Sequence, residues 1–275
     1  MKLGVITSAF VQASKDNIWD TIQSIAKIGF DTVDPFILDL DPWDSEERKK
    51  LKRFIKDVGL EVASITTYVN IWSSDEEVRK EGVKKLIAQL DFGKEMEATN
   101  MEVLAGPVSH GSDTEKGVAR SVIWRNSVDS MQQVARHAEK IQLRIAMELE
   151  PFETSLIYDI DSMLEFLAAV DSEYCLANLD IGHCHIMNRV PPKEIKRLGK
   201  KIIHAHISDN DGKKHNDWVP GEGTVDFKGH FIALKEMGYQ GSVALELWRS
   251  PDPVATVGAS YKYLAKLMDE LGIRG

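Results

Sequence analysis

The sequence predicts an α/β fold, a single (β/α)8 TIM barrel that takes up residues 1–275 as one domain. Three observations lead to this expectation. Short β-rich runs alternate with longer amphipathic runs along the whole chain, which is typical of parallel strands joined by crossover helices. Eight such pairs follow one another without a linker or low-complexity tract. No glycine-rich phosphate-binding motif follows the first run, which argues against an open nucleotide-binding sheet.

The expected strands are short and are spread along the whole chain. In chain order they are Leu3–Thr7, Thr32–Asp34, Glu61–Thr67, Asn100–Ala105, Arg144–Glu148, Cys175–Asp180, Ile202–Ser208 and Ser242–Leu247. We interpret the first run as a strand and not as a secretory leader, because it has no long apolar region and no cleavage site of small residues.

An amphipathic run follows each expected strand and predicts a helix. In order these helices are Asp16–Ile28, Ser45–Val58, Asp75–Glu97, Glu115–Lys140, Asp161–Val170, Pro192–Gly199, Asp226–Met237 and Pro253–Leu271. Gly29, Gly59 and Gly238 stand where helices are expected to end, and glycine adopts the left-handed C-cap conformation without steric cost.

The composition is that of a soluble globular protein and narrows its partners. Apolar residues make up 43% of the chain and charged residues 28%, which is enough for a full core without disorder. A net charge of −9 argues against nucleic acid as a partner, because such binding needs surplus Lys and Arg. No segment is long enough to span a membrane. Cys175 and Cys184 are too few for a disulfide scaffold, so we expect thiols in a reducing cytoplasm.

Metal-competent side chains stand at the carboxyl ends of the last four expected strands, where the active sites of α/β barrels lie. The two-residue period of a strand points Asp180, His206 and Glu246 into the barrel. On the fifth strand, Glu148 and Glu150 share the inward face. We place Glu148 in the site because IAMEL and VALEL carry their glutamates at equivalent depth, and Glu150 stays as the alternative.

We call the four inward-facing residues Glu148, Asp180, His206 and Glu246 the candidate ligand set. Burying three carboxylates and an imidazole in one barrel mouth is costly unless a cation compensates their charge. One divalent metal ion is the simplest compensator. Three oxygen donors and one nitrogen donor suit Mn²⁺ first, with Mg²⁺ and Co²⁺ as alternatives.

Four sequence motifs resemble one known group of barrel enzymes. They are LDIGHCH at Leu179–His185, HAHISDND at His204–Asp211, PGEGTVDF at Pro220–Phe227 and ALEL at Ala244–Leu247. Together they are similar to the xylose isomerase-like superfamily of sugar isomerases and epimerases, which includes tagatose and psicose 3-epimerases, hydroxypyruvate isomerases and inosose dehydratases. The similarity runs nearly end to end. The resemblance implies that the candidate ligand set holds the metal and that His183 faces the substrate.

The resemblance also implies a mechanism. In such enzymes two metal-bound glutamates lie on opposite faces of the substrate, which places Glu148 and Glu246 as the catalytic acid and base. They would remove and return a proton through an enediolate, with His183 stabilising the oxyanion as a third catalytic residue. The sequence is thus interpreted as a sugar isomerase or epimerase whose partner is a small sugar-like substrate.

Other functions stay open on the same scaffold. Proton abstraction beside a carbonyl can end in elimination, so a lyase, either a dehydratase or an enzyme that cleaves C-glycosides or keto-glycosides, is the first alternative. A partner-dependent subunit is the second, and a homo-oligomer stays open because such barrels commonly dimerise. Phosphate on the substrate is also open, with Lys213, Lys214 and Arg249 as candidate binders. A multi-zinc repair nuclease is disfavoured, since no histidine precedes His110.

The remaining candidates have both a structural and a functional interpretation. Residues expected either to contact the substrate or to form a solvated rim are Glu153, Trp248, Arg249, His215 and Asp217. For His185 the sequence favours neither the structural nor the functional interpretation. His204 lies one layer deeper than His206 and is expected to pack or to support the site. His137 and His230 are expected on helix surfaces. Aromatic residues expected in the core rather than in a pocket wall are Trp19, Trp72 and Trp124.

Overall fold

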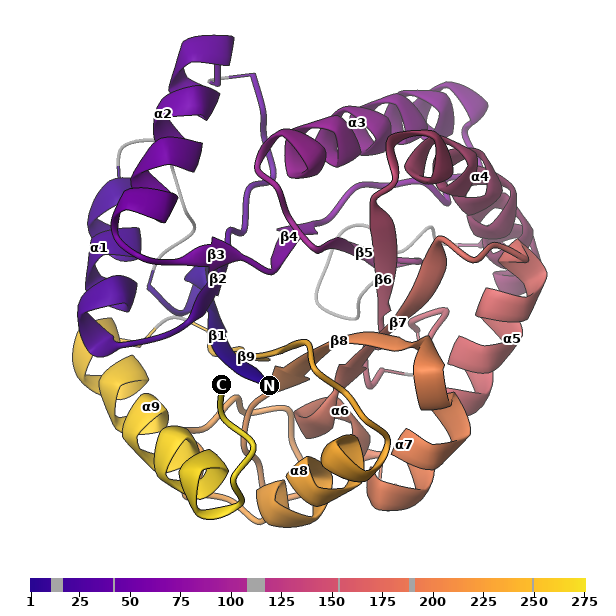
Figure 1. Ribbon diagram of the computed structural model, residues 1–275. Coiled ribbons are helices and arrows are strands. Elements are labelled where there is room, and N and C mark those ends of the chain that lie inside the picture. Colours follow the sequence, from indigo (N-terminus) through magenta and orange to yellow (C-terminus); the bar gives the residue numbers. More distant parts are fainter. Residues whose placement is uncertain (11–16, 42, 108–116, 153, 188–190, 249) are drawn as a thin grey trace.

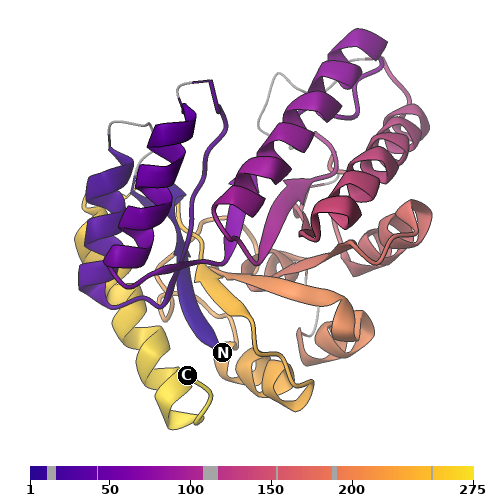
Figure 2. The same ribbon diagram turned by 45° about the horizontal axis from the view of Figure 1, so that its top comes forward.

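The structure of the chain, a computed structural model, describes residues 1–10, 17–41, 43–107, 117–152, 154–187, 191–248 and 250–275. Parallel strands surround a common axis, and helices form an outer ring around them (Figure 1). The predicted (β/α)8 barrel is therefore confirmed. The two chain ends lie close together, as Figure 2 also shows, and the Met1 amino group donates to the Ile273 carbonyl at 2.8 Å.

The sheet consists of parallel strands in the order β3-β2-β1-β9-β8-β7-β6-β5-β4. Their bounds are β1 Lys2–Ile6, β2 Thr32–Asp34, β3 Glu61–Val62, β4 Ser64–Thr67, β5 Asn100–Leu104, β6 Arg144–Glu148, β7 Cys175–Asp180, β8 Ile202–Ile207 and β9 Ser242–Leu245. They correspond to the expected strands with one exception. The third expected strand, Glu61–Thr67, is divided at Ala63 into β3 and β4.

The break at Ala63 lets one stretch of chain serve both ends of the sheet. Before the break, β3 pairs with β2, and after it, β4 pairs with β5. The N–H of Ala63 donates to the Val33 carbonyl at 3.2 Å, and the Ala63 carbonyl accepts from the Asn100 N–H at 3.1 Å. A bridge between Phe36 and Thr66 extends the link toward the carboxyl ends. The two ends of the sheet thus meet here, and the barrel is nearly closed.

The outer helices follow the strands in turn. Their bounds are α1 Ile18–Ile28, α2 Ser45–Asp57, α3 Glu76–Glu95, α4 Arg120–Ile141, α5 Ile160–Val170, α6 Ile181–Ile186, α7 Pro191–Leu198, α8 Phe227–Glu236 and α9 Pro253–Glu270, with 3-10 turns at Thr7–Ala9 and Gly199–Lys201. The left-handed glycines expected at helix ends are confirmed, with φ of 111° at Gly29, 86° at Gly59 and 79° at Gly238. The short helix α6, which begins directly after β7, was not expected from the sequence.

The barrel interior is polar at the level of the candidate site. Strand residues that face the helices are apolar and fully buried, for example Ile65, Ile145 and Val243. The inward-facing residues are buried as well, but many are polar: Asp34, Thr66, Glu102, Asn178, Asp180, His204 and His206. Branched aliphatic side chains usually fill this space in α/β barrels. Buried polar groups need partners, so a cluster of them on the inner face of the sheet indicates a functional site.

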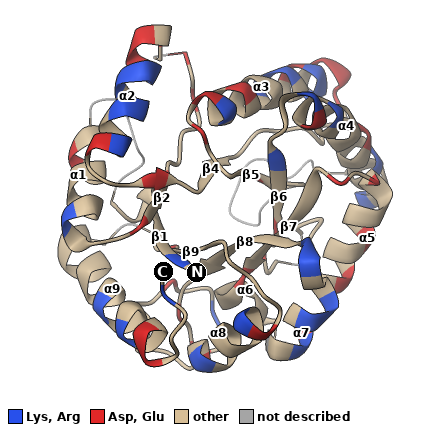
Figure 3. Ribbon diagram, in the orientation of Figure 1, with Lys and Arg blue, Asp and Glu red and all other residues tan. Residues whose placement is uncertain are grey.

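The outer surface carries the charges. Figure 3 shows Lys and Arg mixed with Asp and Glu over the outer helices. In the part of the chain that the structure describes, no helix is long and apolar enough to cross a membrane. Of the three tryptophans expected in the core, Trp72 is fully buried there, whereas Trp19 and Trp124 are partly buried and pack against the core. Cys175 and Cys184 are both buried and form no disulfide.

The expectation for one of the two surface histidines is wrong. His137 is partly exposed on α4 and pairs with Asp91, with His137 Nε2 lying 2.7 Å from Asp91 Oδ1. His230 on α8 is instead 1% exposed. Its Nδ1–H donates to the Asp226 carbonyl at 2.6 Å, and burial lowers the pKa of His230 to about 4. The inward face of α8 therefore includes this uncharged histidine.

Candidate metal centre

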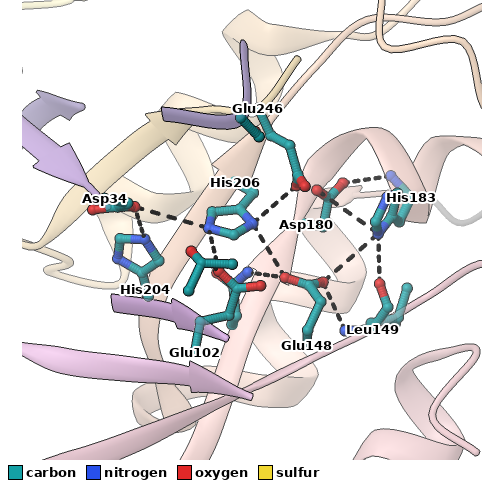
Figure 4. A network of polar contacts seen from close by, with 12 residues as sticks. Asp34, Glu102, Glu148, Leu149, Asp180, His183, His204, His206 and Glu246 are labelled. Atoms are coloured by element: carbon teal, nitrogen blue, oxygen red, sulfur yellow. Dashed lines mark hydrogen bonds and ion pairs between the residues drawn. The ribbon is translucent and has the colours of Figure 1, made fainter. Parts of the chain in front are cut away.

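The candidate ligand set converges on Nδ1 of His206 near the carboxyl ends of β6 to β9 (Figure 4). Oε2 of Glu148 lies 3.1 Å from this nitrogen, and Oε2 of Glu246 lies 3.0 Å from it. Asp180 pairs with His206 in the β7–β8 register. Asp180, His206 and Glu246 each offer one ligand atom within 4.8 Å of the others. The structure thus brings all four residues together.

Four buried atoms of the candidate ligand set have no hydrogen-bond partner among the described residues. They are Asp180 Oδ2, Glu246 Oε2 and the two ring nitrogens of His206. The short distances from His206 to the two glutamates are ion-pair contacts without hydrogen-bond geometry. Buried polar atoms are normally paired, and one divalent cation between Asp180 Oδ2, His206 Nδ1 and Glu246 Oε2 would satisfy three of the four. The donor set therefore fits a hard divalent ion.

The structure distinguishes between Glu148 and Glu150. Glu148 is 4% exposed, contacts His206 and receives a hydrogen bond from the Asn178 side-chain amide. Glu150 lies farther along the chain and lines the cavity described below. Burial raises the pKa of Glu150 to about 8, to which Glu148 and Glu246 contribute by repulsion. Its carboxyl group is therefore largely protonated at neutral pH, and the geometry favours Glu148 for the ligand set.

The candidate ligand set has unequal proton affinities when no cation is bound. Burial raises the pKa of Asp180 to about 7, and the neighbouring glutamates reinforce this against the opposing effect of His183. Burial also acts to raise the pKa of Glu246, but the nearby His206 outweighs it and lowers that pKa to about 2. The pKa of His206 lies well above its usual range, because Glu102 and Glu246 outweigh burial. A cation that binds here must displace protons.

His183 is oriented by the start of α6. Asp180 caps this helix, and its Oδ1 accepts a hydrogen bond from the His183 N–H at 2.6 Å. The ring Nδ1–H of His183 donates to the Leu149 carbonyl at 2.5 Å, and the same nitrogen lies 3.6 Å from Oε1 of Glu148. Its Nε2 lies 2.6 Å from Nε2 of His215. His183 is thus held beside the ligand set, and Asp180 makes the helix cap.

His215 and Asp217 form a second polar group next to the candidate ligand set. Nε2 of His215 lies 3.2 Å from Oδ1 of Asp217. Burial raises the pKa of Asp217 to about 7, and Glu246 adds to the shift. His185 lies elsewhere, with its Nε2 2.9 Å from Oγ1 of Thr224. Of the histidines that the sequence left undecided, His215 therefore belongs to the site and His185 to the loop packing behind it.

The other nitrogen of His206 faces a carboxylate that sequence reasoning missed. Oε2 of Glu102 lies 3.3 Å from Nε2 of His206 (Figure 4), and Thr66 Oγ1 donates to the same oxygen at 2.7 Å. Burial raises the pKa of Glu102 well above its usual range, while His206 acts to lower it. A glutamate on the inward face of the run NMEVL was the available signal, since inward positions of a buried strand are seldom charged.

His204 supports the barrel interior, as one of its two interpretations predicted. Its Nε2–H donates to Oδ2 of Asp34 at 2.7 Å, and Oδ1 of Asp34 accepts from the Ser64 N–H at 3.0 Å. Both side chains are fully buried. His204 therefore ties β8 to β2 across the barrel, one layer below His206.

A cavity of about 240 Å³ opens beside the candidate ligand set. Its lining includes apolar and aromatic residues: Phe36, Leu38, Tyr68, Leu104 and Trp248. It also includes four glutamates: Glu102, Glu148, Glu150 and Glu246. Trp248 is 51% exposed and meets the Phe36 ring edge-on at 6.0 Å between ring centres. A mostly apolar cavity with a few polar groups is typical of a site for one small molecule.

Some predicted substrate-contacting residues are not near this cavity or cannot be placed. Trp248 lines it, as one of its two interpretations expected. Glu153 and Arg249 lie outside the described residues. Lys213 and Lys214 are exposed on the loop after β8 and do not line the cavity. Among the described residues of the lining there is no Lys or Arg.

The chain is similar to one protein family over most of its length. A family model described as a xylose isomerase-like TIM barrel matches residues 22–267. Fructoselysine 3-epimerase from Escherichia coli O157:H7 is 26% identical over 179 residues, which are 65% of this chain and 63% of that protein. The match thus spans less than two thirds of that relative. L-ribulose-5-phosphate 3-epimerase UlaE from Escherichia coli SMS-3-5 is 23% identical over 266 residues, covering 92% of this chain and 91% of that protein.

Solved structures share the architecture. D-psicose 3-epimerase with D-tagatose from Clostridium cellulolyticum H10 superposes with a TM-score of 0.83 at 21% identity, covering 99% of both chains. The IOLI protein, whose structure contains a bound zinc atom, gives a TM-score of 0.79 at 21% identity over 98% of this chain and 99% of that one. At these identities the likeness shows a common fold.

Proposed function

This chain belongs to the xylose isomerase-like TIM barrel family, and on that premise we propose that it is a divalent-metal-dependent isomerase or epimerase of keto sugars. One observation carries the proposal. Glu148 and Glu246 approach Nδ1 of His206 to within 3.1 and 3.0 Å, with buried ligand atoms that lack hydrogen-bond partners among the described residues. The relatives named above as sugar 3-epimerases support the same reaction class.

The candidate ligand set would hold the metal. Its three carboxylates and one imidazole favour Mn²⁺, with Mg²⁺ and Co²⁺ as alternatives, and the zinc in the IOLI protein supports a divalent ion in this fold. A divalent ion bound there supplies positive charge that acidifies a C–H beside a carbonyl and stabilises negative charge on the oxygen.

Glu148 and Glu246 would act as the acid–base pair. Glu148 ends β6 and Glu246 directly follows β9, and they approach His206 from two sides (Figure 4), so a sugar lying between them would meet one carboxylate on each face. One glutamate removes the proton beside the carbonyl, and the other returns a proton to the opposite face of the enediolate. Groups positioned in this way typically contribute about 10²- to 10⁴-fold to the rate of a proton transfer.

His183 would stabilise the negative charge that develops on the substrate oxygen. Its Nδ1–H is engaged by the Leu149 carbonyl, which fixes the ring, and its Nε2 lies 2.6 Å from His215 Nε2. Nε2–H would therefore have to pass from His215 to the substrate oxygen when substrate binds. A donor on a fixed ring near the reacting atoms lowers the barrier for the charge that develops there.

An unphosphorylated keto sugar is the substrate class that the cavity fits best. Its described lining carries carboxylates and apolar side chains without Lys or Arg, and Lys213 and Lys214 point to solvent. A phosphate dianion would meet like charge there. Trp248 and Phe36 offer aromatic faces for the C–H groups of a sugar.

A lyase is the second candidate, and Glu150 favours it. This residue lines the cavity, and its pKa of about 8 keeps a proton available at neutral pH. A protonated carboxyl group can act as a general acid on a leaving oxygen. Once Glu148 or Glu246 has removed the proton beside a carbonyl, elimination of water or of a glycosidic group would then compete with reprotonation.

A screen of keto sugars in D₂O with Mn²⁺ present, followed by NMR, tests the proposal. We expect one keto sugar to give its epimer or isomer, with deuterium at the carbon beside the carbonyl. Loss of water or of an aglycone instead would favour the lyase. A metal-loaded protein that exchanges no proton of any keto sugar, inosose or keto-glycoside would contradict both functions.

A further inference from the structure

We infer that Glu102 is a positioning residue for His206 and thereby sets how tightly the candidate ligand set holds a divalent ion. This inference rests on the proposed metal site and goes beyond it, because Glu102 would act through the imidazole without touching the ion. It predicts that the affinity for metal depends on a cavity-lining side chain outside the ligand set.

The two nitrogens of His206 face two different environments. Nδ1 lies 3.0 Å from Glu246 Oε2 and 3.1 Å from Glu148 Oε2. Nε2 lies 3.3 Å from Glu102 Oε2, on the opposite side of the ring (Figure 4). A neutral imidazole carries one proton, and a nitrogen that binds metal must be free of it. With metal on Nδ1, the proton therefore sits on Nε2. This nitrogen has no hydrogen-bond partner among the described residues, and Glu102, in ion-pair contact without hydrogen-bond geometry, is the carboxylate that would accept the proton once the ring binds metal.

Glu102 is itself held in place. It is 2% exposed, and Thr66 on the neighbouring strand β4 donates to its Oε2 at 2.7 Å. Thr66 and Glu102 are direct partners in the β4–β5 register, so the backbone ladder fixes both. A ring held through its distal N–H by a fixed carboxylate keeps its orientation and becomes a better ligand.

Asp34 is the other carboxylate near Nε2 of His206, but its two oxygens accept hydrogen bonds from other residues. Its Oδ2 lies 3.9 Å from that nitrogen, beyond hydrogen-bond distance. The same oxygen accepts from His204 at 2.7 Å, and Oδ1 accepts from the Ser64 N–H at 3.0 Å. Glu102 is therefore the nearer acceptor for the His206 proton.

The rival interpretation makes Glu102 a ligand in its own right. Glu102, Glu148 and His206 also offer three ligand atoms within 4.8 Å of one another, a set in which Glu102 itself would bind the ion. The two interpretations differ in what an amide does at position 102. A glutamine keeps an oxygen that accepts from Nε2–H, whereas it is a poor replacement for a carboxylate ligand.

The test compares Glu102→Leu with Glu102→Gln. The dissociation constants of Mn²⁺ and Zn²⁺ are measured by competition with a chromophoric chelator, without any substrate. We expect Glu102→Leu to weaken metal binding by about 10- to 100-fold and Glu102→Gln to restore most of the affinity. Glu194→Gln is the matched control, because it neutralises a buried glutamate on α7 that pairs with Arg197 and does not line the cavity; it should bind metal as tightly as the unmodified chain.

NMR of the ¹⁵N-histidine-labelled, zinc-loaded protein gives a second readout, one that a non-specific loss of fold stability in the variant would not reproduce. The His206 Nε2–H proton should exchange slowly with water in the unmodified chain and in Glu102→Gln, and rapidly in Glu102→Leu. If Glu102→Leu does not fold, Thr66→Val carries the test, since it removes the anchor of Glu102 and should weaken metal binding in the same direction.

Two results would overturn the positioning role. One is unchanged metal affinity in both Glu102→Leu and Thr66→Val. The other is a Glu102→Gln variant as weak as Glu102→Leu, which would make Glu102 a direct ligand. An unmodified chain that binds no divalent ion at all would remove the proposed function together with this inference, so the two failures are distinguishable.

Discussion

Oε2 of Glu246 lies 3.0 Å from Nδ1 of His206, and the two residues come from neighbouring segments of the barrel. The register fixes this contact. His206 pairs with Ala244, and the N–H of Glu246 donates to the Ile207 carbonyl at 3.0 Å, just beyond the end of β9. Because backbone hydrogen bonds hold both residues, the contact does not depend on a loop. Such prior positioning is what metal binding and acid–base catalysis both require.

Replacing Glu246 by Gln should abolish turnover while the fold persists. The amide keeps the shape of the side chain but cannot accept the substrate proton, so we expect kcat to fall by about 10²- to 10⁴-fold. Steady-state kinetics on the substrate found by the NMR screen measures the change. Glu222→Gln, an exposed glutamate of the PGEG turn, is the matched control and should keep full activity. Full activity in Glu246→Gln would contradict its role.

The metal-free protein should lose stability as pH rises from about 5 to 8. Burial raises the pKa of Asp180 to about 7 and that of Glu150 to about 8, both above the values of the unfolded chain. In this interval the folded chain holds protons that the unfolded chain has released, so rising pH favours unfolding. Thermal melts of chelator-treated protein measure the effect.

Divalent metal and one substitution should each reduce this pH dependence. Saturating Mn²⁺ stabilises the ionised form of Asp180 and should lessen the fall in Tm across the interval. Glu150→Gln removes one of the titrating groups and should flatten the profile without metal. A Tm of the metal-free protein that rises steadily from pH 5 to pH 8 would show that these carboxyl groups do not have the raised pKa values.

His183→Ala should lower activity more than it lowers metal affinity. Removing a fixed donor to a developing oxyanion costs about 10²- to 10³-fold in kcat. His183 is not a member of the candidate ligand set, so we expect a smaller change in the dissociation constant of Mn²⁺, even though its Nδ1 lies 3.7 Å from Asp180 and 3.6 Å from Glu148. His137→Ala on the surface of α4 is the control and should leave both quantities unchanged. Equal losses in both quantities would assign His183 to metal binding.

Two glycine substitutions should shift stability in opposite directions. A Cβ at Gly82 on α3 would lie 1.9 Å from the Asn70 carbonyl oxygen, a backbone atom that cannot easily move. Gly82→Ala should therefore destabilise the fold by about 1–3 kcal/mol. Gly258 on α9 has no atom within 4 Å of such a Cβ, so Gly258→Ala should stabilise it by about 0.5–1 kcal/mol. Urea unfolding measures both, and a stabilising Gly82→Ala would contradict this packing.

The sequence predicted the barrel because hydrophobic period and glycine punctuation are local signals. It did not predict the division of Glu61–Thr67 at Ala63. That break arises because the two halves pair with different strands, β2 and β5, which are distant from each other in the sequence. It missed α6 because the helix begins directly after β7, where the motif LDIGHCH reads as the end of a strand.

The candidate ligand set was predictable because the strand period alone points its members inward. Glu102 was not predicted, because it lies on β5, the fourth expected strand, outside the four motifs at the last four strands, and one inward glutamate does not by itself indicate a site. The burial of His230 was missed for another reason, since one histidine on an amphipathic helix does not show how deeply the helix is packed.

Anomalous diffraction from crystals of the protein grown with Mn²⁺ tests the central claim most directly. We predict one manganese peak within about 2.0–2.3 Å of Nδ1 of His206 and of a carboxylate oxygen from each acidic member of the candidate ligand set. Absence of a peak from the barrel mouth, or a peak on the Nε2 side of His206 beside Glu102, would contradict the account.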